Sequence, residues 1–406
     1  MSFNLRRLMK IAIISTLHTV PWGGSEELWA AMAREAVDLK HEVVISVYEW
    51  PATPDKIADL ARQGARVLKR PNPYSAKQNS LIRRGARKIQ ASLPVLLQPG
   101  SPFRTLFDVK PDVVCIGQAG PYDTILLTRD LAELLESSSV PYVVVCQYNK
   151  ETFPLNEAAR ESAKQFLSRA FRVAFVAEES ARTAERQLAA SLPNAMVVRN
   201  PVNLTDLSAV PWPSLGQACL ASVARLEVDA KGQDTLFEAL SSPAWRGRDW
   251  QLRLYGQGPD DTYLRKLARH YGISERVVFM GQVSDVRSIW SENHLLVLPS
   301  RVEGTPLAMV EAMLCGRPSV VTDVGGNTEW VAEPQTGFVA EASTARSFGA
   351  ALERAWLTRA RWEEIGKRAR EQALTQYDQE AGKSLLRIIL EAVGLQSLRS
   401  GAKSAA

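Results

Sequence analysis

The stretch Glu303-Gly-Thr-Pro-Leu-Ala-Met-Val-Glu311 places two carboxylates eight residues apart, one on each side of a predicted helix start. Thr305 suits the N-cap and Pro306 suits the first helical position, where its missing N–H costs nothing. We therefore expect Glu303 in the loop before the helix and Glu311 in its second turn. Backbone N–H groups of the first turn would form a site for an anion such as a diphosphate. An ordinary capped helix with solvated acids is the alternative.

Length and composition set wide limits on the rest of the chain. Its 406 residues are 46% hydrophobic and 23% charged, as in globular proteins, and this length predicts two domains. The longest apolar runs, such as 11–14 and 142–146, have the length of strands, so neither a transmembrane helix nor a secretory signal is predicted. The cysteines lack the spacing of metal ligands, and we expect them to be reduced in a cytoplasmic protein. They are Cys115, Cys146, Cys219 and Cys315.

The net charge of +5 conceals a strongly basic segment. Residues 61–110 contain eleven Lys/Arg and one acid, a net +10, so the rest of the chain sums to −5. Within this segment the basic pairs Arg83/Arg84 and Arg87/Lys88 alternate with apolar residues, which favours contact with an anionic membrane surface. A solvated basic loop is the alternative. Nucleic acid is not an expected partner, because no nucleic-acid-binding motif is recognisable.

Short apolar segments alternate with helical patterns along the chain. In the first half, strands are expected near residues 10–15, 43–47, 113–116, 142–146 and 171–176. A Pro-rich break follows, and the second half has expected strands at 218–224, 251–255, 277–280, 295–299 and 319–322. This alternation predicts an α/β protein with two doubly wound parallel sheets and a cleft between them.

The domains implied by this alternation span residues 1–203 and 204–379. A C-terminal helix at about 380–400 is expected to pack back onto the first domain.

Two loops that follow predicted strands point to phosphate binding. Gly23 and Gly24 lie after the first strand and open a helix, so backbone can approach an anion closely there. Arg225 and Lys231 lie six residues apart after the first strand of the second half. Two cations at that spacing suit a departing diphosphate. Surface charges without a ligand are the alternative.

Seven motifs, in order, resemble the retaining glycosyltransferases of family 4, which have the GT-B fold of two Rossmann-like domains facing across a cleft. The resemblance covers most of the chain and is strongest over about 195–335. The motifs are Asn200-Pro-Val-Asn203, Arg225 with Lys231-Gly232, Gly256-Gln-Gly-Pro259, Gly281-Gln-Val283, Pro299-Ser-Arg-Val-Glu303, Glu311 and Gly325-Gly-Asn-Thr-Glu329. Each motif is weak alone, and their order makes the resemblance specific.

The resemblance implies roles for the matching positions. Arg225 and Lys231 would bind the donor diphosphate and support its departure, and Glu303 would hold hydroxyls of the donor sugar. These three are the expected catalytic residues, and Glu311 would hold the ribose hydroxyls. Further donor contacts are expected from Gly23, Gly24, Val283, Gly304, Thr305, Pro306 and Leu307. The resemblance also implies transfer with retention and without a metal, and no Asp-x-Asp triplet occurs in the sequence.

One position departs from the family's pattern. Many members carry a histidine after the strand that corresponds to residues 142–146, near the reacting sugar. Here Gln147 follows that strand. Gln147 is the expected replacement for a sugar or acceptor contact, and His18, in the loop before Gly23, is a second candidate.

The sequence therefore predicts a retaining, metal-independent glycosyltransferase that moves a sugar from a nucleotide-diphosphate donor to a glycan or lipid-linked acceptor. No cofactor is expected. We expect a cytoplasmic protein, peripheral on the inner face of the membrane. The alternatives are a nucleotide-sugar epimerase with the same fold, which would act on the donor without an acceptor, and a non-catalytic sugar-nucleotide-binding protein.

Overall fold

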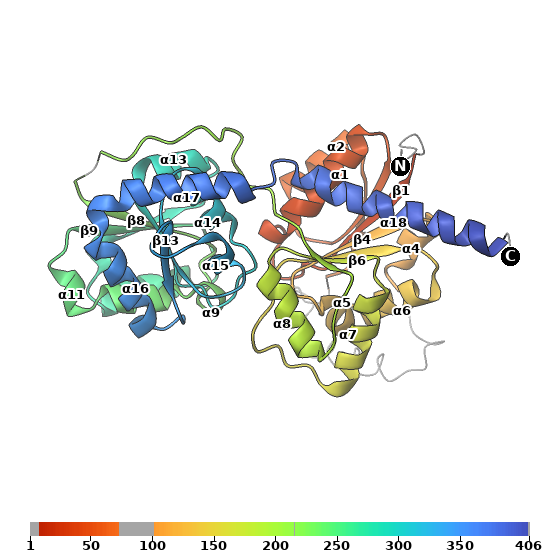
Figure 1. Cartoon of the computed structure of the whole chain (residues 1–406), viewed down its shortest axis with the longest axis horizontal. Coiled ribbons are helices and arrows are strands. Elements are labelled where there is room, and N and C mark those ends of the chain that lie inside the picture. The colour runs from red at the N-terminus through yellow and green to blue at the C-terminus, as the bar shows by residue number, and fades with distance from the viewer. Residues whose placement is uncertain (1–7, 73–100, 215, 405–406) are drawn as a thin grey trace. The chain divides into compact units, whose positions relative to one another are not determined.

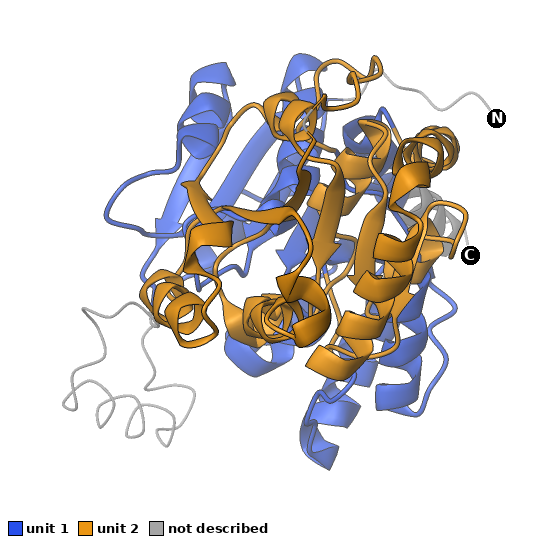
Figure 2. Ribbon diagram, turned by 90° about the vertical axis from the view of Figure 1, so that its left-hand side faces the viewer, with its two compact units in different colours: residues 1–147, 151–201, 379–406 blue, residues 148–150, 202–378 orange. Residues whose placement is uncertain are grey.

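The computed structural model describes residues 8–72, 101–214 and 216–404 (Figure 1). The chain folds into two compact units. Unit 1 comprises residues 1–147, 151–201 and 379–406, and unit 2 comprises residues 148–150 and 202–378 (Figure 2). The main chain thus passes from unit 1 to unit 2 after residue 201 and returns after residue 378.

Unit 1 is built on a seven-stranded sheet in the order β3-β2-β1-β4-β5-β6-β7, and all neighbouring strands are parallel. The strands are β1 (Lys10–Ser15), β2 (Glu42–Tyr48), β3 (Arg66–Arg70), β4 (Val113–Gln118), β5 (Tyr142–Cys146), β6 (Arg172–Phe175) and β7 (Ala195–Val197). The helical segments are η1 (Gly24–Glu26), α1 (Glu27–Asp38), α2 (Asp55–Gln63), α4 (Arg104–Asp108), α5 (Asp123–Leu127), α6 (Arg129–Ser137), α7 (Glu157–Arg169), α8 (Glu178–Leu188) and α18 (Ala381–Ser404).

Unit 2 repeats this plan with a six-stranded sheet in the order β10-β9-β8-β11-β12-β13, again parallel throughout. The strands are β8 (Ala218–Val223), β9 (Trp250–Tyr255), β10 (Val277–Gly281), β11 (Leu295–Leu298), β12 (Ser319–Thr322) and β13 (Gly337–Ala340). The helical segments are α9 (Val228–Lys231), α10 (Gln233–Leu240), α11 (Pro243–Arg246), α12 (Asp261–His270), η4 (Ser274–Arg276), α13 (Val286–Glu292), α14 (Leu307–Leu314), α15 (Asn327–Trp330), α16 (Ala345–Leu357), η5 (Arg359–Arg361) and α17 (Trp362–Gln376).

Successive side chains of a strand point to opposite faces of the sheet, and in the central strands both sets are apolar. Helices therefore pack on both faces. In β1, Ile11 and Ile13 belong to one buried cluster, whereas Ala12 and Ile14 belong to another on the opposite face. The four cysteines are all buried and free of disulfides. The prediction of two doubly wound parallel sheets is therefore confirmed.

The C-terminal helix α18 packs against α1 within unit 1. Gly382 lies so close to Ala31 that a Cβ atom at position 382 would approach the Ala31 carbonyl oxygen to 2.8 Å. A residue without a side chain is therefore needed where the two helix backbones approach.

Three details differ from the sequence-based expectations. The apolar spacing of residues 122–135 predicts one helix, but two form there, because Thr128 leaves helical geometry between α5 and α6. The edge strands β3, β7 and β13 were not predicted, since they are short or, in β3, rich in charge. Arg70, counted with the basic segment, is buried and does not contribute surface charge.

The basic pairs at 83–88 lie outside the described residues, so the predicted membrane contact is not placed by the structure. None of the helices in the described ranges combines the length and apolar character that a membrane span requires.

Candidate active site

The predicted cation and carboxylate meet where the strand order of unit 2 reverses, between β8 and β11. Parallel sheets of this kind bind ligands at the carboxyl ends of the strands at that point. Lys231 ends α9 in the loop after β8, and Glu303 lies in the loop after β11. Lys231 Nζ is 2.6 Å from Glu303 Oε1. The Lys231 side chain remains 24% exposed and that of Glu303 only 7%, so a ligand would meet the ammonium group first.

Arg225 lies in the same loop as Lys231 but pairs with a different carboxylate. Its guanidinium is 3.1 Å from Glu227 Oε2, and both side chains are about a third exposed. Its carbonyl accepts a hydrogen bond from Nε2 of the buried Gln233 (2.8 Å). This bond fixes the backbone at Arg225, while the charged side chain remains partly exposed.

Arg301 joins the two loops that carry the Lys231–Glu303 pair. Its backbone N–H donates to the Ala230 carbonyl (2.8 Å), and its guanidinium binds the Asp234 carboxylate through two bonds of 2.8 and 3.0 Å. The same guanidinium donates to the Val228 carbonyl. These contacts hold α9, and with it Lys231, against the loop of Glu303.

Ser300 also forms a hydrogen bond to the Glu303 carboxylate. Its hydroxyl donates to Glu303 Oε1 at 2.8 Å, so Oε1 accepts from both Ser300 and Lys231.

Glycines allow the loops of unit 2 to touch through their backbones. Gly256 has φ +132°, and a Cβ atom there would lie 2.2 Å from the Ala224 carbonyl oxygen. At Gly325, with φ +54°, a Cβ atom would lie 2.3 Å from the Glu303 carbonyl oxygen. The N–H of Gly326 donates to the Gly304 carbonyl (2.6 Å). Two glycine motifs of the sequence therefore brace the loops of the charged residues.

The start of the helix after Glu303 differs by one residue from the prediction. α14 begins at Leu307, and Pro306 is its N-cap, without a side-chain capping bond; the assignment of Thr305 as N-cap is therefore wrong. Proline cannot donate at this position, and its carbonyl accepts from Met309 and Val310. In the described residues no acceptor is recorded for the N–H groups of Leu307 and Ala308. An anion at this pole is therefore physically reasonable.

Glu311 lies in the second turn of α14, as predicted, and is 4% exposed. Its Oε1 accepts from the backbone N–H of Asn203 (2.9 Å) and from Asn203 Nδ2 (3.1 Å). Asn203 closes the first motif of the resemblance, so the structure links two motifs that are 108 residues apart.

Val283 follows β10 and packs on the same hydrophobic cluster as Met309 and Val310 of α14.

The predicted site residues of unit 1 lie at the carboxyl edge of its own sheet. Gly23 precedes η1 and Gly24 begins it. His18 Nδ1 is 3.4 Å from the Thr16 carbonyl oxygen, and partial burial lowers the pKa of His18. The next acid along, Glu26, is fully buried, and burial raises its pKa to about 7.

Gln147 is engaged within unit 1. Its Nε2 donates to Asn200 Oδ1 (3.2 Å), and Asn200 Nδ2 donates back to Gln147 Oε1 (2.8 Å). Both side chains are buried. The two bonds hold the Gln147 amide against Asn200 and leave one N–H and one oxygen lone pair of each amide for another partner.

The structure thus gathers most of the predicted set on unit 2 and leaves four residues on unit 1. The unit 2 group consists of Arg225, Lys231, Val283, Glu303, Gly304, Thr305, Pro306, Leu307 and Glu311, and the unit 1 group consists of Gly23, Gly24, His18 and Gln147. Sequence reasoning gave no role to Ser300, Arg301 or Asn203. All three lie inside quoted motifs, which was the available signal, but their partners are distant in sequence.

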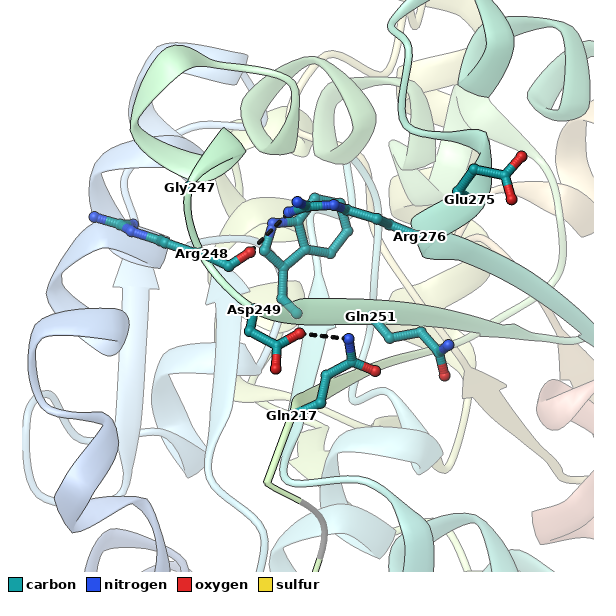
Figure 3. Close-up of a pocket in the computed structure, with 8 residues that line it drawn as sticks. Gln217, Gly247, Arg248, Asp249, Gln251, Glu275 and Arg276 are labelled. Carbon is teal, nitrogen blue, oxygen red and sulfur yellow. Dashed lines mark hydrogen bonds between the residues drawn. The ribbon is translucent and has the colours of Figure 1, made fainter.

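Two cavities lie away from these loops. One, of about 340 Å³, is at the amino-terminal edge of the unit 2 sheet, where Gln217 donates to Asp249 (2.6 Å) and Arg276 donates to the Arg248 carbonyl (2.8 Å) (Figure 3). The other, of about 400 Å³, lies between α6 and α7 of unit 1. The predicted site residues line neither cavity. The loops at the carboxyl edge, which hold the predicted residues, therefore remain the candidate site.

Possible metal ligands are also dispersed. In the described part of the chain, no cluster of three or more His, Cys, Asp or Glu side chains is arranged to hold a metal ion.

Comparison with known proteins identifies the domain that carries the charged loops. Residues 217–357 match the family model described as glycosyl transferases group 1. The chain is 32% identical over 112 residues to an uncharacterised glycosyltransferase of Haemophilus influenzae, and 36% identical over 111 residues to alpha-D-kanosaminyltransferase of Streptomyces kanamyceticus. Each alignment covers 27% of this chain, and they cover 32% and 29% of the relatives' own lengths. The predicted resemblance to glycosyltransferases is therefore confirmed over residues 217–357, where the matching family is group 1.

Longer but weaker matches extend over most of the chain. A GDP-mannose-dependent alpha-(1-6)-phosphatidylinositol monomannoside mannosyltransferase of Mycolicibacterium smegmatis is 24% identical over 339 residues, which cover 79% of this chain and 82% of the relative. The crystal structure of Anabaena Alr3699/HepE in complex with UDP superposes with a TM-score of 0.69 at 18% identity, covering 95% of this chain and 100% of the other. The structural likeness shows that the two units have the GT-B fold.

Proposed function

We propose that this protein is a retaining glycosyltransferase that transfers a sugar from a nucleotide-diphosphate donor to a glycan or lipid-linked acceptor without a metal ion. The observation that carries the proposal is the Lys231–Glu303 pair at the reversal point of the unit 2 sheet. It sets a partly exposed cation, which suits a diphosphate, beside a buried carboxylate, which suits the hydroxyls of a sugar. The match of residues 217–357 to group 1 glycosyl transferases supports the same activity.

The charges suggest how the leaving group is stabilised. Lys231 and Arg225 would bind the diphosphate oxygens, and the N–H groups at the start of α14 would add the positive helix pole. The negative charge on the diphosphate grows as its bond to the sugar breaks, so these groups stabilise the transition state more than the bound donor. Binding the diphosphate would compete with Glu303 for Lys231, which frees the carboxylate to hold sugar hydroxyls.

Transfer with retention follows from the resemblance to family 4. The bond between the anomeric carbon and the diphosphate oxygen breaks, and its electron pair leaves with the diphosphate. The acceptor hydroxyl oxygen then bonds to the same face of the sugar, and its proton passes to the departing diphosphate. No group on the protein needs to form a covalent intermediate in this scheme.

The relatives suggest which donors to test first. One solved neighbour is a complex with UDP-glucose, and the mycobacterial relative is named as GDP-mannose-dependent. The latter acts on a phosphatidylinositol mannoside, which is consistent with a lipid-linked acceptor here. We propose that residues 61–110 bring the protein to an anionic membrane surface on the cytoplasmic side. Reduced binding of an Arg83/Arg84/Arg87/Lys88→Ala variant to anionic liposomes would support this membrane role, and unchanged binding would oppose it.

The test of the proposal has two stages. UDP, GDP and ADP, and a glucose or mannose derivative of each, are first screened by thermal shift, because a ligand that binds the folded state raises its melting temperature. The sugar nucleotide that binds is then supplied with candidate acceptors, with and without EDTA, and the anomeric configuration of the product is determined by NMR. We expect a retained configuration and a rate that EDTA does not change.

Two variants connect the activity to the site. Lys231→Ala and Glu303→Gln should each lower transfer by about a hundredfold to a thousandfold, the scale of a lost electrostatic contact to a transition state. Lys266→Ala on α12 and Glu371→Gln on α17 change the same residue types at exposed positions and serve as controls. Wild-type turnover in either site variant would contradict the mechanism. Epimerised donor in the absence of acceptor would favour an epimerase instead.

A further inference from the structure

We propose that Asn203 is a positioning residue for nucleotide binding: it holds the Glu311 carboxylate in the orientation that receives the ribose hydroxyls. This inference rests on the proposed function, from which it takes the nucleotide donor, and on the ribose role that the family resemblance implies for Glu311.

Asn203 and Glu311 are joined by two hydrogen bonds that end on the same atom. Two donors of one residue, the backbone N–H and the side-chain Nδ2 of Asn203, converge on a single carboxylate oxygen, Oε1 of Glu311, at 2.9 and 3.1 Å. Both distances are those of normal hydrogen bonds. Two bonds to one oxygen fix the rotation of the carboxylate about its last side-chain torsion, which is otherwise soft. The carboxylate is then held in one orientation.

Glu311 depends on this contact more than Asn203 does, because Glu311 is buried. Glu311 is 4% exposed and lies between the buried Val310 and Ala312 on α14. A buried carboxylate needs hydrogen bonds to offset its lost hydration. Asn203 is exposed, so water would satisfy its amide equally well. The bond therefore stabilises the acid far more than the amide.

The backbone that carries Asn203 is itself held in place. Pro201 fixes the backbone two residues earlier, and Asn203 is the second residue of unit 2 after the chain leaves unit 1. At the return of the chain, Tyr377 packs on the hydrophobic cluster that includes Val310 and Ala312, the neighbours of Glu311 on α14. The backbone that carries Asn203 therefore lies in a packed part of unit 2.

A purely structural role for Asn203 would tie this segment to α14 and nothing more. The two roles differ in one measurable respect. A structural role lowers stability or weakens every ligand alike. A positioning role changes the part of the binding energy that comes from the ribose hydroxyls, because those are the groups that donate to Glu311.

The experiment therefore compares ligands with and without these hydroxyls. UDP, GDP and ADP, and the 2′,3′-dideoxy form of each, are titrated calorimetrically into the full chain. The proteins are wild type, Asn203→Ala, Asn203→Asp and the control Thr205→Ala, an exposed residue two positions along. Asn203→Ala removes one donor, whereas Asn203→Asp also places a second negative charge beside Glu311. Melting temperatures report folding, and Asn203→Ser replaces Asn203→Ala should the latter fail to fold.

We expect the wild type to bind one ribonucleotide more tightly than its dideoxy form. Asn203→Ala should weaken the ribonucleotide roughly tenfold, the scale of one hydrogen bond to a charged group, and leave the dideoxy form unchanged. Asn203→Asp should weaken the ribonucleotide further. In a Glu311→Gln background, Asn203→Ala should cause a much smaller additional loss, since the two residues act through one contact.

Three results would overturn the inference, and they differ in what else they affect. An Asn203→Ala protein that keeps the wild-type ratio between the two forms, or that loses both equally, leaves Asn203 with a structural role only while the proposed function stands. Equal binding of both forms by the wild type removes the ribose role of Glu311. Failure of the wild type to bind any of the nucleotides overturns the proposed function and this inference together.

Discussion

The loops at the carboxyl edge of the unit 1 sheet and those of the unit 2 sheet are held in different ways. In unit 2 the braces are glycine backbones and an ion pair between the buried Glu303 carboxylate and Lys231, whose ammonium group is partly exposed. In unit 1 the braces are buried ionisable side chains. Glu26 lies beneath the loop after β1, and Asp123 accepts from the N–H groups of residues 119 and 120 and from the Thr16 hydroxyl.

Burial changes what those side chains of unit 1 can do. It raises the pKa of Glu26 to about 7 and that of Asp123 to about 6. Arg70 lies between the rings of Tyr48 and Phe103 and donates to the Ser15 carbonyl (2.6 Å), and burial lowers its pKa to about 10. These groups are buried, so they fix the shape of the loops without exposing charge to a ligand. The comparison indicates that charge for a ligand comes mainly from unit 2.

Gly325→Ala should have the largest effect, and it tests whether glycine backbones brace the loops of unit 2. The new Cβ atom would lie 2.3 Å from the Glu303 carbonyl oxygen, at a residue whose φ is +54°. We expect a loss of about 3 kcal/mol in unfolding free energy together with weaker nucleotide binding. Urea unfolding and calorimetry measure both. Gly247→Ala is the control, since a Cβ atom there has open space and φ is −86°. Equal effects of the two substitutions would contradict the bracing role.

The corresponding test of unit 1 is the pH dependence of stability with and without Glu26. Its folded pKa of about 7 exceeds the unfolded value of 4.5, so the folded state binds the proton more tightly. Its contribution is then fully present below pH 4.5 and is lost as the pH rises through 7. A shift of this size corresponds to a loss on the order of 3 kcal/mol.

Glu26→Gln replaces the acid by a neutral amide of the same shape. We expect its unfolding free energy to fall less than that of wild type between pH 4.5 and 7, as measured by urea unfolding at several pH values. Glu35→Gln, at the other end of α1, should keep the wild-type slope. An unchanged slope in Glu26→Gln would show that Glu26 is ionised in the folded protein and would remove this part of the comparison.

Arg301→Lys separates the position of Lys231 from its charge. Lysine keeps the positive charge but cannot reproduce the two-bond contact with Asp234 or reach the Val228 carbonyl at the same time. We expect transfer to fall by about tenfold to thirtyfold, roughly 2 kcal/mol, with little change in melting temperature. Steady-state kinetics measure this, and Arg346→Lys at an exposed position of α16 is the control. Wild-type kinetics would mean that α9 is held by its backbone contacts alone.

These tests also mark where sequence reasoning reaches its limit. The alternation of apolar strands and helices predicted both sheets, because fully buried parallel strands are continuous apolar runs. The edge strand β3 was missed, since its sequence Arg-Val-Leu-Lys-Arg has the composition of a surface segment. Its last residue, Arg70, is nevertheless buried, which the rings of Tyr48 and Phe103 and the hydrogen bonds to Ser46 and Ser15 explain.

The candidate site shows the same division. The types and order of Arg225, Lys231, Glu303 and Glu311 pointed to a diphosphate donor. Which groups pair was not accessible from the sequence, because the partners of Glu311 and of Arg301 are distant along the chain and are brought together by the sheet. The N-cap of α14 was displaced by one residue, a shift that propensity alone does not resolve.

The smallest expected effect concerns Gln147, the residue of unit 1 predicted to contact sugar. Its amide and that of Asn200 are hydrogen-bonded to each other, so Gln147→Ala leaves a buried amide unpaired. We expect a loss of about 1 kcal/mol in unfolding free energy and little change in the KM for the donor. The double variant Gln147→Met/Asn200→Leu, which removes both partners and keeps the volume, should recover most of that loss.

A sugar contact would give the opposite pattern. Gln147→Ala would then lower kcat or raise the donor KM without loss of stability, and the apolar double variant would restore neither. Urea unfolding and steady-state kinetics on the same three proteins distinguish the two. Because the amide pair lies at the carboxyl edge of unit 1, the sugar-contact pattern would also show that unit 1 contributes polar groups to the ligand, and would narrow the contrast with unit 2.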